Sequence, residues 1–446
     1  MTDTGSKVVP LEPRSPEFSE DNLALRFADQ YGRDLRYVDK WGKWLIWDGR
    51  RWQFDDTRKV FDLSRTVCRA ASAQCNEKWA KAIAGAQTVY GVTNLARADR
   101  KLAATVAQWD ADPWLLSTPA GTVDLRSGAL RPHSAENYIT KITGVAPDPS
   151  CKITLWRSVL DRAAGGDQAL QDYLQRLFGY ALTGSTREHS LLFAYGRGAN
   201  SKGTILNAIT GCMGEYHRTA PVETFTASNV DRHPTDLAGL HGARLVTAVE
   251  TEEGRRWAES RIKQLTGGDI VSARFMRQDF FDYTPQFTLI IVGNHKPGLR
   301  SVDEAIRRRF HLIPFNVTIR REERDPELGD KLKAEWPGIL QWCIVGCIAW
   351  QEQGLNPPAA VIDATAAYLE AEDATAAWIE DECERDPNAW ERTTNLFSAW
   401  RSWADRTGEY AGAQKRFVLN LEARGFKEHR KNYGRGFDGI RLKTGG

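Results

Sequence analysis

The sequence predicts an α/β fold with a parallel sheet at its centre, and three apolar stretches carry this prediction. They cover residues 191–194, 243–249 and 287–294, and each is short, rich in Leu, Val, Ile or Phe, and followed by a loop. Helical and loop segments separate these stretches, as they do between strands that are buried on both faces of a sheet. The same alternation continues to about residue 314.

A glycine-rich loop with one lysine follows the first predicted strand. Residues 190–204 read SLLFAYGRGANSKGT, and the next ten residues, ILNAITGCMG, have the apolar spacing of a helix. This order is the P-loop arrangement, in which backbone N–H groups and a helix N-terminus bind phosphate and the lysine contacts the β- and γ-phosphates. The residues expected to contact the nucleotide are Gly196, Gly198, Asn200, Ser201, Lys202, Gly203 and Thr204.

The loop departs from the usual pattern G-x-x-x-x-G-K-[ST] at two positions. Ser201 replaces the second glycine, although that position needs a backbone conformation that glycine adopts more easily. Gly203 stands where a magnesium-binding hydroxyl is expected, and Thr204 follows one residue later. An ordinary strand–turn–helix is the alternative for this stretch alone, and the residues further along favour phosphate binding.

Composition and charge exclude several classes of protein. The 446 residues are 41% hydrophobic and 26% charged, as in a globular protein of about two to four domains. No apolar stretch is long enough to span a bilayer and the polar N-terminus is not a signal peptide, so no membrane association is expected. The 7 cysteines form no CxxC pair, which favours reduced thiols in a cytoplasmic protein.

Changes in pattern along the chain predict six segments. They are a flexible N-terminus (1–20), an α+β N-terminal domain (21–150), a helical collar (151–185), the sheet core (186–325), a helical segment (326–388) and a small C-terminal module of two helices and a β-hairpin (389–446). The net charge is only +2, but residues 415–443 hold nine Lys or Arg against three Asp or Glu. Such a run is either a solvated face or a contact for nucleic acid.

Polar residues follow the second and third predicted strands. Glu250 ends the second, with Glu252 two residues later, and Asn294 ends the third. The carboxyl ends of parallel strands meet at one edge of a sheet, so these groups are expected near Lys202. Glu250 would hold magnesium or activate water with Glu252 as its partner, and Asn294 would bind the γ-phosphate or the attacking water. Solvated strand ends and a turn asparagine are the alternatives.

A predicted hairpin lies between the second and third strands. IVSARF and FFDYTP would be its two strands, with Arg274 and Arg277 near the tip and Phe275 and Phe280 beside them. Cations beside aromatic rings suit a nucleic-acid backbone and its bases. A surface hairpin with an apolar inner face is the alternative.

Three consecutive arginines follow the third strand. Arg307, Arg308 and Arg309 precede a short apolar strand, and arginine is suited to stabilising a transferring phosphoryl group across a subunit boundary. The alternative is a basic helix end, where cations are favoured.

In order and spacing these motifs resemble the superfamily 3 helicases of the AAA+ ATPases. More narrowly, they are similar to phage and plasmid primase-helicases, a group that includes the poxvirus primase-helicase. WLIWDGRRW, GTVDLRSG and LQRLFGYALTG resemble the domain that precedes the motor in that group, and GRGANSKGT is similar to its P-loop. The resemblance implies an AAA+-type core, and a winged-helix-like DNA-binding module in the C-terminal segment.

The resemblance also implies roles for individual residues. Glu250 and Glu252 match the Walker B motif, and Asn294 matches sensor 1. Arg308 and Arg309 match the arginine finger. The residues that match the motif leading into the DNA-binding hairpin are Lys263, Gly267, Gly268, Asp269 and Arg274. ATP and Mg²⁺, the latter at Thr204 and Glu250, would be bound between copies of a hexameric ring that threads single-stranded DNA.

The resulting hypothesis is a ring-shaped, ATP-dependent replicative DNA helicase of a phage or mobile element, acting in the bacterial cytoplasm on single-stranded or forked DNA. No primase motif is found before residue 20, so a separate primase or polymerase is an expected partner. Two alternatives stay open: an origin-binding or helicase-loader ATPase that remodels DNA without processive unwinding, and a primase-helicase with an unrecognised priming site. The carboxylates considered for that site are Asp48, Asp55, Asp110, Asp112 and Asp124.

Overall fold

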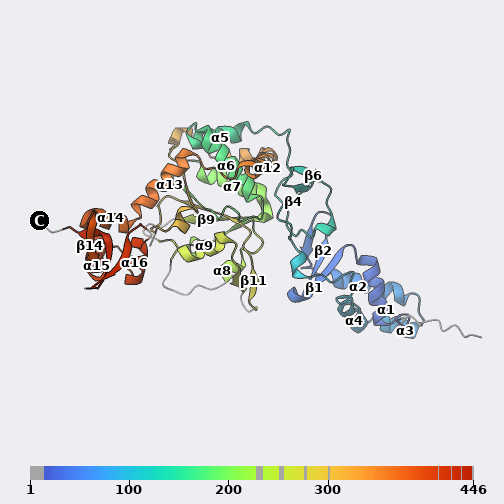
Figure 1. The fold of residues 1–446 in the computed structure, drawn as a ribbon. Coiled ribbons are helices and arrows are strands. Elements are labelled where there is room, and N and C mark those ends of the chain that lie inside the picture. Colours follow the sequence, from blue (N-terminus) through green and yellow to red (C-terminus); the bar gives the residue numbers. More distant parts are fainter. Residues whose placement is uncertain are drawn as a thin grey trace, which may run out of the picture. The chain divides into compact units, whose positions relative to one another are not determined.

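The chain divides into two compact units in the computed structural model, which describes residues 15–227, 235–250, 256–275, 279–299, 302–409, 411–422, 424–432 and 434–443 (Figure 1). The first unit holds residues up to 124 together with 129–146, and the second holds 125–128 and the chain from 147 onward. Residues 1–14 of the N-terminus expected to be flexible lie outside the described residues.

The first unit is of the α+β type. Its elements are α1 (Glu20–Tyr31), β1 (Leu35–Val38), β2 (Lys43–Trp47), β3 (Trp52–Phe54), α2 (Lys59–Ser72), α3 (Glu77–Ile83), α4 (Ala86–Ala96), β4 (Leu115–Thr118), β5 (Gly121–Asp124) and β6 (Ala129–Arg131). The strands form two antiparallel sheets, β1-β2-β3 and β4-β5-β6. Asp48 and Gly49 form a tight turn between β2 and β3, in which the Asp48 carboxylate accepts hydrogen bonds from the N–H groups of Arg50 and Arg51 at 2.7 and 2.8 Å.

A five-stranded sheet is the centre of the second unit. Its order is β13 (Phe310–Pro314), β7 (Leu191–Tyr195), β12 (Thr288–Gly293), β9 (Leu245–Glu250) and β8 (His217–Thr219), and all neighbouring pairs are parallel. The three strands predicted from apolar stretches are therefore confirmed as β7, β9 and β12. They lie inside the sheet, which explains why their sequences are apolar on both faces.

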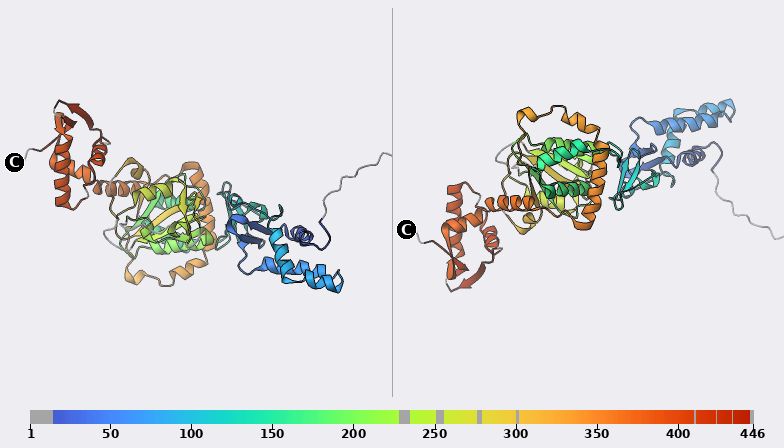
Figure 2. Two further views of the ribbon diagram at one scale, coloured as in Figure 1. Left: turned by 90° about the horizontal axis from the view of Figure 1, so that it is seen from below. Right: turned by 90° about the horizontal axis from the view of Figure 1, so that it is seen from above.

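Helices cover both faces of this sheet (Figures 1 and 2). One face carries α5 (Thr154–Ala164), α6 (Gln168–Ala181), α7 (Lys202–Met213) and α12 (Trp336–Gln353), and the other carries α8 (Thr235–Ala238), α9 (Glu259–Gly267) and α13 (Ala359–Ala371). Two glycines let α6 and α12 pack closely: a Cβ on Gly179 would lie 2.1 Å from the backbone of Cys347, and one on Gly346 would lie 2.0 Å from that of Gln175. The shorter helices are α10 (Glu304–Arg307) and α11 (Leu328–Lys333).

The C-terminal module is formed by α14 (Ala374–Glu382), β14 (Cys383–Arg392), α15 (Thr393–Thr407), α16 (Gln414–Glu422), β15 (Lys427–Lys431) and β16 (Gly434–Leu442). Its three-stranded antiparallel sheet has the order β14-β16-β15. The two helices and the final hairpin were expected from the sequence, whereas β14 was not. Buried aromatic side chains, among them Trp378, Trp400 and Phe417, form its core.

Within the described parts of the chain, no helix combines the length and the apolar character needed to cross a membrane.

Candidate nucleotide site at the sheet edge

The ends of β7, β12 and β9 lie side by side. Tyr195 of β7 pairs with Gly293 of β12, and Gly293 pairs in turn with Glu250 of β9. Neighbouring strands are about 4.8 Å apart, so the backbones of Tyr195 and Glu250 are roughly 10 Å apart. Gly196 begins the glycine-rich loop and Asn294 follows β12 at this same edge. The Glu250 side chain lies outside the described part of the structure, as does all of Glu252.

Lys202 and Asn294 meet at this edge. The Lys202 amine donates a hydrogen bond to the Asn294 Oδ1 at 3.3 Å and another to the backbone carbonyl of Gly196. Lys202 is only 6% exposed, and burial lowers the pKa of its amine from 10.5 to about 8. Among the described residues its acceptors are neutral oxygens, and no carboxylate pairs with it. Lys202 is therefore a buried cation that has no counter-ion among the described residues.

The position of Lys202 at the start of its helix also favours an anion beside its amine. Lys202 is the first residue of α7, where the unpaired N–H groups of the first turn carry partial positive charge. A lysine at a helix N-terminus is unfavourable unless an anion lies nearby. Thr204 is in the same first turn and is partly exposed. The start of α7 is therefore suited to bind a group with several negative oxygens.

The chain that follows β13 holds the loop in place. The Asn200 Nδ2 donates to the backbone carbonyl of Phe315 at 3.1 Å, and the N–H of Ile319 donates to the carbonyl of Ala199 at 2.7 Å. A Cβ on Gly196 would lie 2.2 Å from that Phe315 oxygen, so only glycine fits there. The Asn200 side chain is buried, and its hydrogen bond to Phe315 holds the loop against the chain that follows β13.

The remaining residues of the loop differ in backbone conformation and in the space around their Cβ positions. Ser201 has φ +64°, in the left-handed region that the missing glycine would adopt at lower cost, and Ala199 has φ +56°. Gly198 and Gly203, in contrast, have no neighbouring atom within 4 Å of where a Cβ would lie. The loop thus holds two non-glycine residues in a conformation that disfavours side chains.

Comparisons with known proteins agree with this architecture. A family model described as D5 N terminal like matches residues 24–165, and one described as a family of unknown function (DUF5906) matches residues 194–309. The chain is 22% identical over 347 residues to "Putative helicase L207/L206" of Acanthamoeba polyphaga mimivirus, covering 72% of this chain and 35% of that protein. It is 23% identical over 325 residues to "Putative helicase 022R" of Frog virus 3, covering 67% of this chain and 32% of that protein.

The first part of the chain is thus similar to the D5 N terminal like family, and the viral relatives it matches are named putative helicases. The chain spans about a third of the length of the two viral relatives. Two solved structures of the NrS-1 C-terminal region share its fold. One aligns with a TM-score of 0.51 at 10% identity, covering 96% of this chain and 100% of that one. The other aligns with a TM-score of 0.50 at 11% identity, covering 81% and 78%.

The three consecutive arginines have different surroundings in the structure. Arg307 forms an ion pair with Asp373, with 3.6 Å between its Nη2 and the carboxylate. Arg309 is 9% exposed and its Nη1 donates to the carbonyl of Ala305 at 2.9 Å. Arg308 lies at the end of α10 and is exposed. Of the two predicted arginine-finger residues, Arg308 is therefore the one whose side chain is open to solvent.

The predicted DNA-binding residues also have different surroundings. β10 (Val271–Ala273) and β11 (Phe281–Tyr283) form the expected antiparallel hairpin, and the Arg274 guanidinium lies 4.7 Å from the centre of the Phe280 ring. Arg277, at the tip, lies outside the described residues. Lys263 of α9 pairs with Asp303, with 2.5 Å between the amine and the carboxylate, and so joins α9 to the start of α10.

The carboxylates considered for priming are each used locally. Asp48, Asp55 and Asp112 accept hydrogen bonds from backbone N–H groups, in a turn, at the start of α2 and at Trp114. Asp110 forms an ion pair with Lys141, and Asp124 forms one with Arg131. Among the described residues, no group of three or more His, Cys, Asp or Glu could hold a metal ion.

Sequence reasoning missed residues that support the site. Lys296 lies 4.6 Å from the centre of the Tyr195 ring, at the end of β7. Phe315 accepts the hydrogen bond that shapes the loop, through its backbone. Lys296 follows Asn294 by two residues and could have been noticed, but a backbone acceptor has no sequence signal.

Proposed function

We propose that this chain is the motor of an ATP-dependent replicative DNA helicase and that its sheet core is an AAA+ domain of superfamily 3. The observation that carries the proposal is the hydrogen bond of 3.3 Å between the Lys202 amine and the Asn294 amide oxygen, at the edge where β9 ends in Glu250. A cation, an amide and an acidic strand end are the groups that phosphoryl transfer from a nucleoside triphosphate requires.

The residues at this edge fit a magnesium-bound nucleotide. Phosphate oxygens would give the Lys202 amine charged acceptors in place of two neutral ones, and such hydrogen bonds are stronger. Backbone N–H groups in the first turn of α7 would bind further phosphate oxygens. Thr204 and Glu250 would hold Mg²⁺, which neutralises charge on the phosphates. Asn294 would orient the γ-phosphate or a water molecule.

We further propose that a neighbouring copy of the chain completes each site, in a ring of six. Arg308 is exposed at the end of α10, whereas Arg309 is held by the backbone carbonyl of Ala305 in α10. Arg308 would therefore reach the phosphates bound at Lys202 of the adjoining copy. An arginine supplied across a boundary stabilises transition-state charge and makes hydrolysis depend on assembly.

Two surfaces are proposed to contact DNA. On the hairpin, Phe275 and Phe280 are 42% and 57% exposed and the Arg274 guanidinium lies beside the Phe280 ring, which suits stacking with bases and contact with phosphates. The second surface is the C-terminal module, as a winged-helix-like unit whose β15–β16 hairpin carries exposed Lys427, Arg430 and Arg435.

Substitution of the loop lysine tests the proposal. Lys202→Ala is expected to lower single-stranded-DNA-stimulated ATP hydrolysis about 100-fold or more and to abolish displacement of a strand from a forked duplex. Lys333→Ala is the matched control, because Lys333 is an exposed lysine on α11 in the same unit. ATP hydrolysis by Lys202→Ala at the rate of the unchanged protein would contradict the proposal.

One observation favours the second candidate, an ATPase that loads or remodels DNA without processive unwinding. Ser201 holds its left-handed conformation at a cost that glycine would avoid, and a strained loop is compatible with slow turnover. The two functions differ in strand displacement. A loader would bind DNA in an ATP-dependent manner and leave a forked duplex intact, whereas the helicase separates its strands.

A further inference from the structure

The C-terminal end of α13 supports the segments that leave the proposed nucleotide site. The Tyr368 hydroxyl accepts a hydrogen bond from the Trp257 indole at 3.0 Å and donates one to the carbonyl of Pro297. The Glu372 carboxylate accepts a hydrogen bond from the N–H of Leu299 at 2.8 Å. Trp257 lies beyond β9 and Pro297 and Leu299 lie beyond β12, so α13 contacts the chain after both of these strands.

Asp373, the next residue, joins three further parts of the second unit. One carboxylate oxygen accepts a hydrogen bond from the N–H of Ala376 at 3.1 Å and caps the start of α14, and it also pairs with the guanidinium of Arg424. The other oxygen lies 3.6 Å from the Arg307 Nη2. The Asp373 side chain is 9% exposed, that of Arg424 is 18% exposed and that of Arg307 is 44% exposed.

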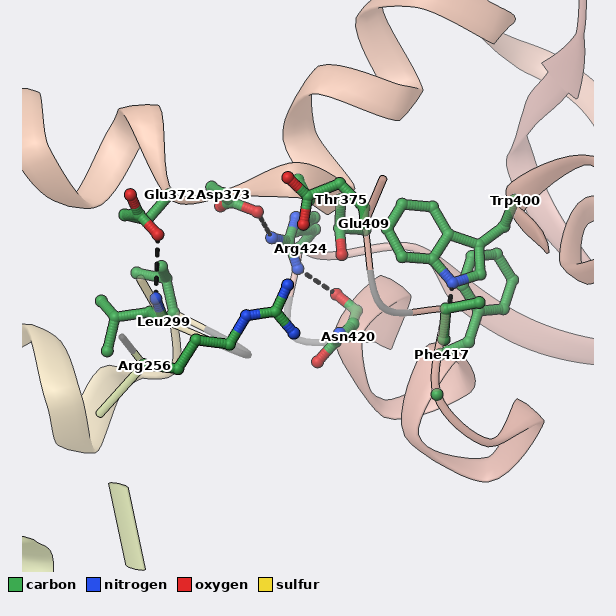
Figure 3. A pocket seen from close by; sticks show the side chains of 14 residues that line it. Arg256, Leu299, Glu372, Asp373, Thr375, Trp400, Glu409, Phe417, Asn420 and Arg424 are labelled. Carbon is green, nitrogen blue, oxygen red and sulfur yellow. Dashed lines mark hydrogen bonds and ion pairs between the residues drawn. The ribbon is translucent and has the colours of Figure 1, made fainter. Parts of the chain in front are cut away.

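Figure 3 shows Asp373 and Arg424 among the side chains that line a pocket. Arg424 extends from the C-terminal module and contacts Asp373, while its second contact is the backbone carbonyl of Asn420 at 2.7 Å. Arg256, from the segment after β9, points into the same pocket, and the Glu372–Leu299 hydrogen bond borders it.

We propose that Asp373 is a positioning residue that fixes the arginine turn, residues 307–309, and couples it to the C-terminal module through Arg424. The inference rests on the proposed function, in which Arg308 completes the site of the adjoining copy. Arg307 is the last residue of α10 and Arg308 follows it directly, so the ion pair at Arg307 sets the direction in which Arg308 leaves the helix. DNA bound to the C-terminal module changes the hold of Arg424 on Asp373 and thereby the rate of ATP hydrolysis.

Two substitutions of Asp373 separate this role from a purely structural one. Asparagine caps a helix as well as aspartate does but carries no charge, whereas glutamate keeps the charge and is a poorer cap. If Asp373 acts through the arginines, Asp373→Asn lowers the kcat of DNA-stimulated ATP hydrolysis about threefold to tenfold and leaves KM within about twofold, and Asp373→Glu retains most of the rate. If Asp373 is only a cap, the order of the two variants is reversed, and that result overturns the inference.

A second variant tests the coupling to the C-terminal module. Arg424→Gln is expected to reduce the stimulation of ATP hydrolysis by DNA about threefold or more while its affinity for ATP stays unchanged. Glu370→Gln is the matched control, because Glu370 is an exposed carboxylate on α13 only three residues from Asp373. Full stimulation in Arg424→Gln would overturn the coupling.

Failure of this inference and failure of the proposed function give different results. Assayed beside these variants, Lys202→Ala reports only on the nucleotide site. If Lys202→Ala is inactive while Asp373→Asn and Arg424→Gln behave as the unchanged protein, the motor stands and the positioning role is wrong. If Lys202→Ala hydrolyses ATP normally, the proposed function itself is wrong.

Discussion

Replacement of Lys202 by methionine is expected to stabilise the nucleotide-free protein while it abolishes activity. Burial lowers the pKa of the Lys202 amine from 10.5 to about 8, so the folded protein is penalised for holding the charged form. A shift of this size corresponds to about 3 kcal/mol at neutral pH. Methionine loses the hydrogen bonds to Gly196 and Asn294, each worth about 1 kcal/mol, so a net gain of roughly 1–2 kcal/mol remains.

The pH dependence of this gain identifies its cause. Below pH 8 the folded and the unfolded chain both hold the proton of Lys202, and the penalty is fully present. Between about pH 8 and 10.5 only the unfolded chain keeps the Lys202 amine protonated. The free energy of unfolding of the unchanged protein therefore rises with pH relative to that of the Lys202→Met variant. The advantage of the variant should therefore be largest at pH 7 and should shrink towards pH 10.

Thermal unfolding without nucleotide measures the effect. At pH 7 the transition of the second unit should be about 2–6 °C higher in Lys202→Met than in the unchanged protein. Lys333→Met, at an exposed lysine, should show no such pH-dependent difference. A lower transition temperature for Lys202→Met at pH 7, or a difference that is the same at all pH values, would refute the reasoning.

Three other predictions concern the same loop. Gly196→Ala should abolish nucleotide binding because its Cβ would lie 2.2 Å from the Phe315 oxygen, whereas Gly198→Ala should bind normally; equal affinities in a fluorescent-nucleotide titration would contradict this. Ser201→Gly should raise the free energy of unfolding by about 0.5–1 kcal/mol in urea, because φ is +64° there, and a loss of stability would argue against the strain. Nucleotide affinity should fall as the pH rises above about 8, where Lys202 loses its proton; calorimetry should detect proton uptake on binding at pH 9, and no uptake would disagree with the low pKa.

The sequence predicted the centre of the second unit well because its strands are buried on both faces. β7, β9 and β12 are continuous apolar runs, and the glycine-rich loop after β7 and the polar residues that end β9 and follow β12 marked the same sheet edge. Strand β14 was missed because CERDPNAWER is polar and contains Asp-Pro-Asn, which is typical of a turn. It is an edge strand that bends between Arg385 and Trp390, and an edge strand needs no alternating pattern.

The supports of the site could not be predicted because they depend on tertiary contacts. Asn200 belongs to the P-loop motif, yet its side chain bonds a backbone carbonyl 115 residues away. Lys263 belongs to a motif that implied DNA binding, yet it pairs with Asp303. Asp373 lies in an alanine-rich helical stretch, and its partners Arg307 and Arg424 are distant in the sequence. Such partners are determined only when the helices are packed.

A structure of the chain with a non-hydrolysable ATP analogue, Mg²⁺ and single-stranded DNA is the most direct test of the central claim. The triphosphate should lie at the start of α7, with its β- and γ-phosphates within hydrogen-bonding distance of the Lys202 amine. The γ-phosphate should also lie near Asn294 and near Arg308 of an adjoining copy. A nucleotide bound elsewhere, or a Lys202 amine still bonded to Gly196 and Asn294 with the analogue present, would contradict that claim.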